Sequence, residues 1–353
     1  MQFQFNIDTC FTVGQVYAKY FFLDLSKPLV ITFGTAGSLV SQDDVLNASS
    51  PWGFDFIKGQ GHNVLSFSSL KPASWYRETE FLDFLTSLRL PHFPQLLGYG
   101  SSMGGFGVSA FANLLQFDRV LLINPISTLN KNLAPWETRF ENAARRLDWS
   151  TGAFDGSTIK CNGLIVYDPI CDIDSKHARR YGAHMQRLKI FGVGHAVPEH
   201  LKNMGVLSSL LKNFLNDTID AALVHKQFRA RRNILRNYNW LLSKENSHLT
   251  PARESIIRRY RTQFLQTYQP KHGENLKSVA LTSDEVDLLR DAAVKLEKID
   301  LIKAHKLMSI AAKYRKGPYI LKKVKEYEVA INLKAMQRAK RINSLDTDLA
   351  APS

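Results

Sequence analysis

Short apolar runs alternate with stretches of helical spacing through residues 16–215 of the chain. The short runs, rich in Leu, Val and Ile, lie at residues 16–25, 28–33, 63–67, 95–99, 119–123, 161–167 and 188–193. Apolar residues recur at helical spacing in residues 74–90, 108–115, 175–186 and 199–215. Continuous apolar runs of this length are typical of strands buried on both faces. Strands separated by helices predict an α/β fold with a mostly parallel sheet flanked by helices.

Residues 130–160 interrupt this alternation. They lack strong periodicity and contain Trp136, Trp149 and two glycines. We interpret them as a short insertion between two strands of the sheet.

The pattern changes again near the C-terminus. Residues 284–316 contain two helical patterns, one over residues 288–296 and one over residues 304–312, and the pair closes at Gly317-Pro318. One such pair loosely resembles a tetratricopeptide-type hairpin, although arrays of that kind usually need about three copies. We therefore expect one helical hairpin that packs on the first domain or on a partner.

Positive charge is concentrated in the C-terminal part. The whole chain has a net charge of +14, but residues 1–216 contain 19 Lys and Arg against 17 Asp and Glu, whereas residues 217–353 contain 27 against 15. This asymmetry indicates a second module. We predict an α/β domain over residues 1–216, a basic all-α domain over residues 217–343 and a disordered tail over residues 344–353.

The basic module suggests an anionic partner, but its charges have a simpler interpretation. Glu and Asp are mixed with the Lys and Arg, so most of the charges are expected to form a solvated helix face. Nucleic acid is not an expected partner, because no recognisable nucleic-acid-binding module accompanies the charge. A protein or an anionic polymer, such as an acidic polysaccharide, stays an open alternative.

Several classes of protein do not fit the sequence. The first residues lack a basic region followed by a long apolar stretch, and no run reaches the 18 or more apolar residues that span a membrane. Cys10, Cys161 and Cys171 are too few and too scattered for a disulfide framework, so we expect free thiols and a cytoplasmic protein. No His, Cys and Asp cluster has metal-ligand spacing, and we expect neither a metal nor another cofactor.

The strongest chemical motif lies between the run at residues 95–99 and the helical pattern that follows it. Gly100-Ser101-Ser102-Met103-Gly104 fits G-x-S-x-G, the nucleophile elbow of serine hydrolases. The turn is sharp, so the residues two before and two after the serine must lack clashing side chains. Ser101 is out of frame with the two glycines. Ser102 is therefore the candidate nucleophile.

A serine nucleophile needs a base and an acid that orients the base, and on this type of sheet the chain order is Ser, Asp or Glu, then His. His195 follows the last predicted strand and is the candidate base. Three aspartates follow the preceding strand, namely Asp168, Asp172 and Asp174. All these residues lie at carboxyl ends of strands, where reactive groups gather in such sheets.

The three aspartates compete for the role of the acid. Asp168 precedes Pro169 and fits a turn, and Asp174 fits a helix N-cap. Asp172 has the more usual distance beyond its strand, so the residues alone favour Asp172. His177, on the helix that follows, is interpreted as a surface residue rather than a second base.

Two backbone N–H groups are needed to bind the negative oxygen that forms during acyl transfer. One is expected from Met103, the residue after the nucleophile. The other is expected from the small-residue loop of Gly34, Thr35 and Ala36, which follows the run at residues 28–33. A phosphate-binding loop is the alternative, but no Lys follows at the required spacing and no G-x-G-x-x-G is present.

Residues 28–215 resemble the α/β-hydrolase superfamily, with an oxyanion loop at residues 34–37, the elbow around Ser102, an acid loop at residues 168–174 and His195 after the last strand. The resemblance extends to a bacterial subgroup in which the aspartate shortly before a His-Ala pair is the candidate acid. That likeness implies Asp174, which precedes His177-Ala178. Most superfamily members are esterases, thioesterases, peptidases, lipases or acyltransferases, and some are not catalytic. The short insertion argues against a deep lipase-type lid.

These observations favour a serine hydrolase that cleaves an ester or other acyl bond in a small acyl or acylated-sugar substrate. The rival is a non-catalytic adaptor that carries the basic helices to a partner. An acyltransferase is the third alternative, since the same triad serves if an alcohol replaces water. Four aromatic residues can either line a sugar pocket or pack in the core, namely Trp52, Trp75, Tyr76 and Trp136.

Overall fold

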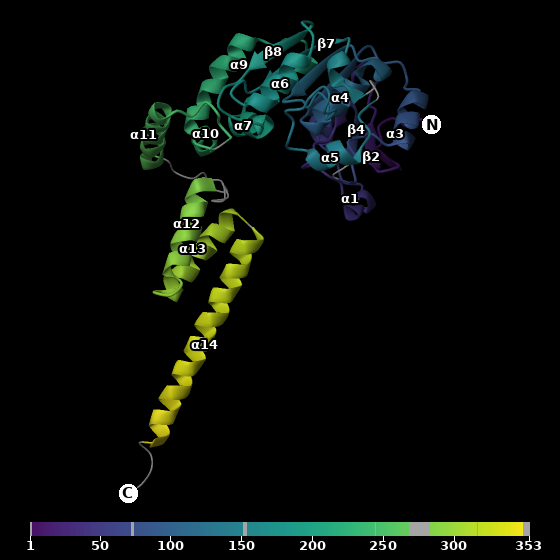
Figure 1. The fold of residues 1–353 in the computed structure, drawn as a ribbon. Coiled ribbons are helices and arrows are strands. Elements are labelled where there is room, and N and C mark those ends of the chain that lie inside the picture. The colour runs from purple at the N-terminus through teal and green to yellow at the C-terminus, as the bar shows by residue number, and fades with distance from the viewer. Residues whose placement is uncertain are drawn as a thin grey trace. The chain divides into compact units, whose positions relative to one another are not determined.

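The predicted α/β architecture is confirmed. The computed structural model describes residues 2–71, 74–150, 154–243, 245–267, 283–315 and 317–348. Within these ranges, eight strands form a sheet in the order β1-β2-β4-β3-β5-β6-β7-β8 (Figure 1). The strands are β1 (Thr9–Val13), β2 (Val16–Phe21), β3 (Leu29–Phe33), β4 (Asn63–Ser69), β5 (Leu96–Ser101), β6 (Arg119–Ile123), β7 (Asn162–Tyr167) and β8 (Met185–Lys189). Strands β3 to β8 pair in parallel, whereas β1 and β2 form an antiparallel edge, so the sheet is mostly parallel.

Helices cover both faces of the sheet. One face packs against α3 (Thr79–Ser87), α4 (Met103–Leu115) and α6 (Asp172–Arg180). The other packs against α2 (Phe54–Gly59), α7 (Val197–Asn203), α8 (Val206–Leu215) and α9 (Ala221–Phe228). Alternate strand residues serve the two faces, as Ile31 and Val30 do in β3. Shorter elements are α1 (Gln42–Leu46), α5 (Glu141–Arg146), η2 (Gly156–Thr158) and η3 (Arg229–Asn233).

Several element boundaries differ from the predicted ones. The run at residues 16–25 is the second strand of a hairpin, whose turn uses Gly14 at φ 54°. The helix predicted from residue 74 begins at Thr79, because Trp75 and Tyr76 have positive φ angles. The helix predicted over residues 199–215 is divided into α7 and α8 at Gly205, whose φ is 72°.

The last predicted strand is displaced along the chain. Strand β8 ends at Lys189, and Ile190 and Val193 are buried in a loop rather than a strand, whereas Phe191 is exposed. Within that loop the N–H groups of Gly192, Val193 and Gly194 bond to the Asp168 carboxylate instead of a neighbouring strand. A side chain therefore takes the place of a strand ladder just before His195.

The chain divides into two compact units, which comprise residues 1–234 with 245–248 and residues 235–244 with 249–353. The predicted boundary after residue 216 precedes α9, whereas the structure assigns α9 to the first unit. Val224 and Phe228 of α9 are buried in the core that α7 and α8 form on one face of the sheet, which explains the later boundary.

The second unit is helical. Its helices are α10 (Leu235–Leu241), α11 (Pro251–Thr267), α12 (Ser283–Leu296), α13 (Leu301–Tyr314) and α14 (Pro318–Asp348). Helices α12 and α13 form the expected pair, but α14 adds Ile320 and Tyr327 to their small core. Pro318 opens α14 instead of ending the helical region, because Pro fits the first helical position.

The C-terminal residues only partly match the predicted tail. Helix α14 continues to Asp348, so residues 344–348 are helical, and residues 349–353 lie outside the described residues.

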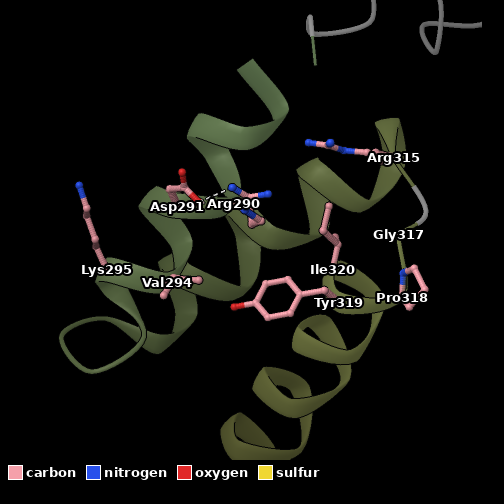
Figure 2. A pocket seen from close by; sticks show the side chains of 9 residues that line it. All are labelled: Arg290, Asp291, Val294, Lys295, Arg315, Gly317, Pro318, Tyr319 and Ile320. Atoms are coloured by element: carbon pink, nitrogen blue, oxygen red, sulfur yellow. Dashed lines mark hydrogen bonds and ion pairs between the residues drawn. The ribbon is translucent and has the colours of Figure 1, made fainter. Parts of the chain in front are cut away.

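A cavity of about 650 Å³ lies between α12, the end of α13 and the start of α14 (Figure 2). Its lining includes Arg290, Lys295, Arg315 and Tyr319. No helix in the described part of the chain is both long and apolar enough to cross a membrane.

Candidate active site

Ser102 lies in a sharp turn between β5 and α4. Its backbone has φ 52° and ψ −119°, a conformation that L-residues rarely adopt. The two flanking glycines make this turn possible. A Cβ atom at Gly100 would lie 2.3 Å from the carbonyl oxygen of Gly104, and one at Gly104 would lie 2.0 Å from the carbonyl oxygen of Phe33. Any side chain at either position would collide with backbone, as expected for a nucleophile elbow.

His195 lies against Ser102. The Nε2 atom of His195 is 2.9 Å from Oγ of Ser102. The loop that presents His195 is held by Asp168, whose Oδ2 accepts the N–H groups of Gly192, Val193 and Gly194 at 2.9, 2.7 and 2.7 Å. Asp168 is thus a buried anchor that shapes the histidine loop.

The structure brings Asp174, and not Asp172, to His195. Both carboxylate oxygens of Asp174 are 2.9 Å from Nδ1 of His195, and this side chain is fully buried. Asp172 is half exposed and contacts Ser247 and His248 instead. Helix α6 begins at Asp172, and residues two apart on a helix do not share a face. The residues alone favoured Asp172 because of its distance beyond β7. That distance does not reveal which side chain of α6 faces His195, so the assignment is corrected to Asp174.

Arg139 is the main residue of the site that the sequence did not indicate. Its Nη1 atom is 2.8 Å from Oδ1 of Asp174 and 2.9 Å from Nδ1 of His195. Burial alone would raise the pKa of Asp174, but the adjacent His195 and Arg139 outweigh burial and lower that pKa. The acid therefore stays ionised although it is shielded from water.

Asn124 covers the histidine from another side. Its Nδ2 atom is 3.1 Å from Nδ1 and 3.3 Å from Nε2 of His195, and its Oδ1 accepts a hydrogen bond from Ser101 at 3.3 Å. Asn124 has a φ of 38° at the end of β6, which aims its side chain at the site. The hydroxyl of Ser101 is thereby bound away from His195.

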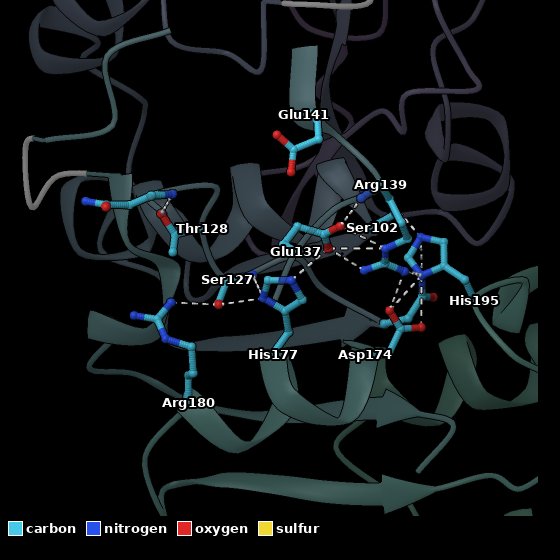
Figure 3. A network of polar contacts seen from close by, with 12 residues as sticks. Ser102, Ser127, Thr128, Glu137, Arg139, Glu141, Asp174, His177, Arg180 and His195 are labelled. Carbon is cyan, nitrogen blue, oxygen red and sulfur yellow. Dashed lines mark hydrogen bonds and ion pairs between the residues drawn. The ribbon is translucent and has the colours of Figure 1, made fainter. Parts of the chain in front are cut away.

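A second layer of charge continues outward from Arg139 (Figure 3). Glu137 forms an ion pair with Arg139 at 2.6 Å and bonds to Nε2 of His177 at 2.9 Å. His177 is fully buried, so its interpretation as a surface residue is wrong. It lies three residues after Asp174 and therefore faces the same way from α6. The aperiodic insertion thus supplies two charged groups next to the candidate triad.

The layer ends in a further ion pair. The backbone N–H and hydroxyl of Ser127 lie 3.1 and 2.8 Å from Nδ1 of His177. Arg180 donates to Oγ of Ser127 at 2.7 Å and pairs with Asp155 at 2.6 Å. Every ionised group in this chain of contacts has an opposite charge or a hydrogen-bonding partner, which a buried network requires.

Replacing Glu137 by Gln is expected to reduce the free energy of unfolding at pH 7 by about 3 kcal/mol, because it removes one of the two carboxylates that pair with the buried Arg139 cation and leaves only Asp174. Burial raises the pKa of Glu137, but bonds from His177 and Arg139 prevail and lower it from 4.5 to about 2. A lowered folded-state pKa means that the stabilisation is complete above about pH 4.5 and is lost as the pH falls toward 2. Urea titrations from pH 7 to 3 should therefore show wild type and variant converging.

Glu141→Gln is the matched control for this experiment. Glu141 belongs to the same insertion and pairs with Lys131, but both side chains are more than a third exposed. Its loss should change stability by less than about 1 kcal/mol. A Glu137→Gln deficit that stays constant from pH 7 to 3, or that Glu141→Gln reproduces, would contradict the buried ion pair.

Some of the N–H groups predicted to bind the oxyanion already donate a hydrogen bond within the protein, and others do not. Met103 is the first residue of α4, and the first N–H groups of a helix have no acceptor within it. The N–H of Gly34 bonds to Phe67, and the N–H of Thr35 bonds to Oγ of Ser38 at 2.7 Å. Among the described residues, no acceptor lies within bonding distance of the Ala36 N–H. Met103 at the start of α4 and Ala36 in the loop are therefore the two predicted donors whose N–H groups have no acceptor among the described residues.

The four aromatic residues that were considered for a sugar pocket make packing contacts. Trp75 and Tyr76 are buried in the core, and the Trp52 ring packs at a tilt against Tyr99 with ring centroids 4.7 Å apart. Trp136 lies edge-on to His177. Among the residues that the structure describes, no group of three or more His, Cys, Asp or Glu side chains is arranged to hold a metal ion.

Solved structures of similar chain path exist at low identity. Carboxyl esterase 2 from the fungus Tuber melanosporum is 17% identical, with a TM-score of 0.37 over 64% of this chain and 87% of that one. The capsule O-acetyltransferase of Neisseria meningitidis serogroup A is 13% identical, with a TM-score of 0.39 over 59% and 94%. A sugar hydrolase from Lactococcus lactis is 14% identical, with a TM-score of 0.41 over 64% and 100%. No family model matches the sequence, and no curated protein matches it.

Proposed function

We propose that this chain is an α/β-hydrolase and a serine hydrolase that cleaves an ester or another acyl bond. The observation that carries the proposal is the unbroken line of contacts from Ser102 through His195 to Asp174, each 2.9 Å long. Nucleophile, base and acid in this order are the constellation of serine hydrolases. The ionised state of Asp174 supports the role of acid, because the negative charge stabilises the protonated imidazole.

This geometry supports the following first half of the reaction. Nε2 of His195 takes the proton of Ser102 as Oγ attacks the carbonyl carbon of the substrate. The carbonyl oxygen becomes negative, and the N–H groups of Met103 and Ala36 bind it. The tetrahedral intermediate then collapses, the bond to the leaving group breaks, and His195 returns the proton to that group. Ser102 is left as an acyl ester.

The second half regenerates the serine. A water molecule gives a proton to Nε2 of His195 and attacks the acyl carbon, and Oγ of Ser102 leaves and recovers the proton. An alcohol that takes the place of water would receive the acyl group instead, so the same residues support acyl transfer. The proposed substrate is a small acyl ester, such as an acylated sugar.

A fluorophosphonate probe tests the proposal. It should label the native protein, and peptide mass mapping should place the phosphonate on Ser102 rather than on Ser101. Heat-denatured protein is the control, because a serine without its base does not react. Absence of labelling in the native protein, or equal labelling after denaturation, would favour the adaptor alternative. Turnover of short acyl esters, acylated sugars and thioesters, with and without an alcohol acceptor, then separates hydrolysis from transfer.

A further inference from the structure

Two consecutive aromatic residues behind the oxyanion loop have an unusual backbone. Trp75 has a φ of 47° and Tyr76 a φ of 57°, although neither is a glycine and both are buried. Bulky residues rarely adopt positive φ, and they keep it only where the surrounding structure enforces it. The surrounding structure therefore holds this turn in a strained conformation that fixes the direction of both side chains.

The turn aims the Tyr76 hydroxyl at the oxyanion loop. This hydroxyl donates a hydrogen bond to the carbonyl oxygen of Gly34 at 2.7 Å, and the Tyr76 ring lies edge-on to Phe33 with centroids 5.1 Å apart. Burial raises the pKa of Tyr76 well above its ordinary value of 10, so the hydroxyl keeps its proton and acts as a donor. Trp75 packs against Phe106 of α4 and so ties the turn to the nucleophile helix.

The acceptor of this bond shares a rigid unit with the loop. The Gly34 carbonyl and the Thr35 N–H belong to one planar peptide group, so fixing the carbonyl also fixes the direction of the N–H. That N–H bonds to Oγ of Ser38, which closes the turn around Ala36. The Gly34 N–H is held by β4 through Phe67. The Tyr76 hydroxyl thus holds the carbonyl side of the first peptide in the loop, and Oγ of Ser38 holds its N–H side.

We propose that Tyr76 is a positioning residue that orients the oxyanion loop through the Gly34 carbonyl. It acts through the loop and touches no reacting atom. The inference rests on the proposed hydrolase function, because a loop that binds no oxyanion needs no such orientation. Its consequence is that loss of one hydroxyl should weaken transition-state binding more than substrate binding.

The test compares Tyr76→Phe with Tyr181→Phe in the full chain. Tyr181 is also buried, and its hydroxyl contacts Ser109 at 3.1 Å within the helical layer, so it controls for loss of a buried hydroxyl. Tyr76→Phe should reduce kcat for an acyl ester by about 10- to 100-fold with little change in KM, and an alkyl boronic acid, which forms a tetrahedral adduct with Ser102, should bind more weakly by the same factor. Tyr181→Phe should keep both quantities within about twofold, as expected of a change that only affects packing.

The outcomes separate the inference from the function beneath it. A wild-type chain without turnover or labelling contradicts the proposed function and, with it, this inference. An active wild type with equal boronate affinity in Tyr76→Phe and Tyr181→Phe contradicts the inference alone. Should Tyr76→Phe not fold, Ser38→Ala acts on the same peptide from its other side. The Tyr76 bond to Gly34 remains in Ser38→Ala, so boronate affinity should stay within about twofold, and a loss of about 10-fold or more would assign the orientation of this peptide to Ser38 and overturn the positioning role of Tyr76.

Discussion

Replacement of Ser102 by Ala is expected to lower kcat/KM for an acyl ester by about 10⁴- to 10⁶-fold, because no other group can form the acyl-enzyme. The hydroxyl lost is the one 2.9 Å from Nε2 of His195. Substrate binding and the oxyanion donors remain, so a small residual rate over water is expected. Steady-state kinetics with a chromogenic ester measure the loss, and circular dichroism checks the fold.

Ser101→Ala is the matched control for this variant. Its hydroxyl is one residue away but makes a long bond of 3.3 Å to Asn124 and does not reach His195. Removing one weak hydrogen bond should change the rate by less than about fivefold. Comparable losses in the two variants, or an unaffected Ser102→Ala, would contradict the assignment of the nucleophile.

Replacement of Asp174 by Asn is expected to lower kcat by about 10⁴-fold, the magnitude known when a triad acid becomes an amide. The amide nitrogen donates to Nδ1 of His195, which forces the proton onto Nε2 and leaves the base unable to accept one from Ser102. The cation of Arg139, 2.8 Å from Asp174, also loses an anionic partner. The loss should therefore appear in kcat rather than in KM.

Asp172→Asn provides the comparison that decides between the two aspartates. Asp172 lies two residues away and bonds to Ser247 and His248 at the surface. An exposed pair of this kind contributes little, so activity should stay within about twofold of wild type. A larger loss in Asp172→Asn than in Asp174→Asn would overturn the acid assignment. Thermal denaturation of both variants separates activity from folding.

The parts of the site that depend on local sequence could be predicted. The elbow requires two glycines at fixed distances from Ser102, and both requirements lie within five residues. The parallel sheet follows from apolar runs short enough to be strands, and six of its strands pair in parallel. The position of His195 follows from chain order. Each of these features depends on residues that are close together in the sequence or that follow one another in a fixed order.

Features that depend on helix phase or on distant partners could not be predicted. The residues alone favoured Asp172, and only the resemblance to the bacterial subgroup implied Asp174, because the choice depends on where α6 begins and a change of two residues turns the carboxylate to the opposite face. The burial of His177 depends on Glu137, 40 residues earlier in the chain. Arg139 lies in an aperiodic segment whose role is visible only once it folds over the sheet. Sequence pattern carries no signal for such pairings.

The ion pair between Arg139 and Asp174 has a consequence for the insertion. Arg139 belongs to the insertion, whereas Asp174 lies on helix α6 and His195 lies in the loop after β8. The pair therefore ties the insertion to the triad, so the positive charge beside the acid depends on the insertion keeping its place.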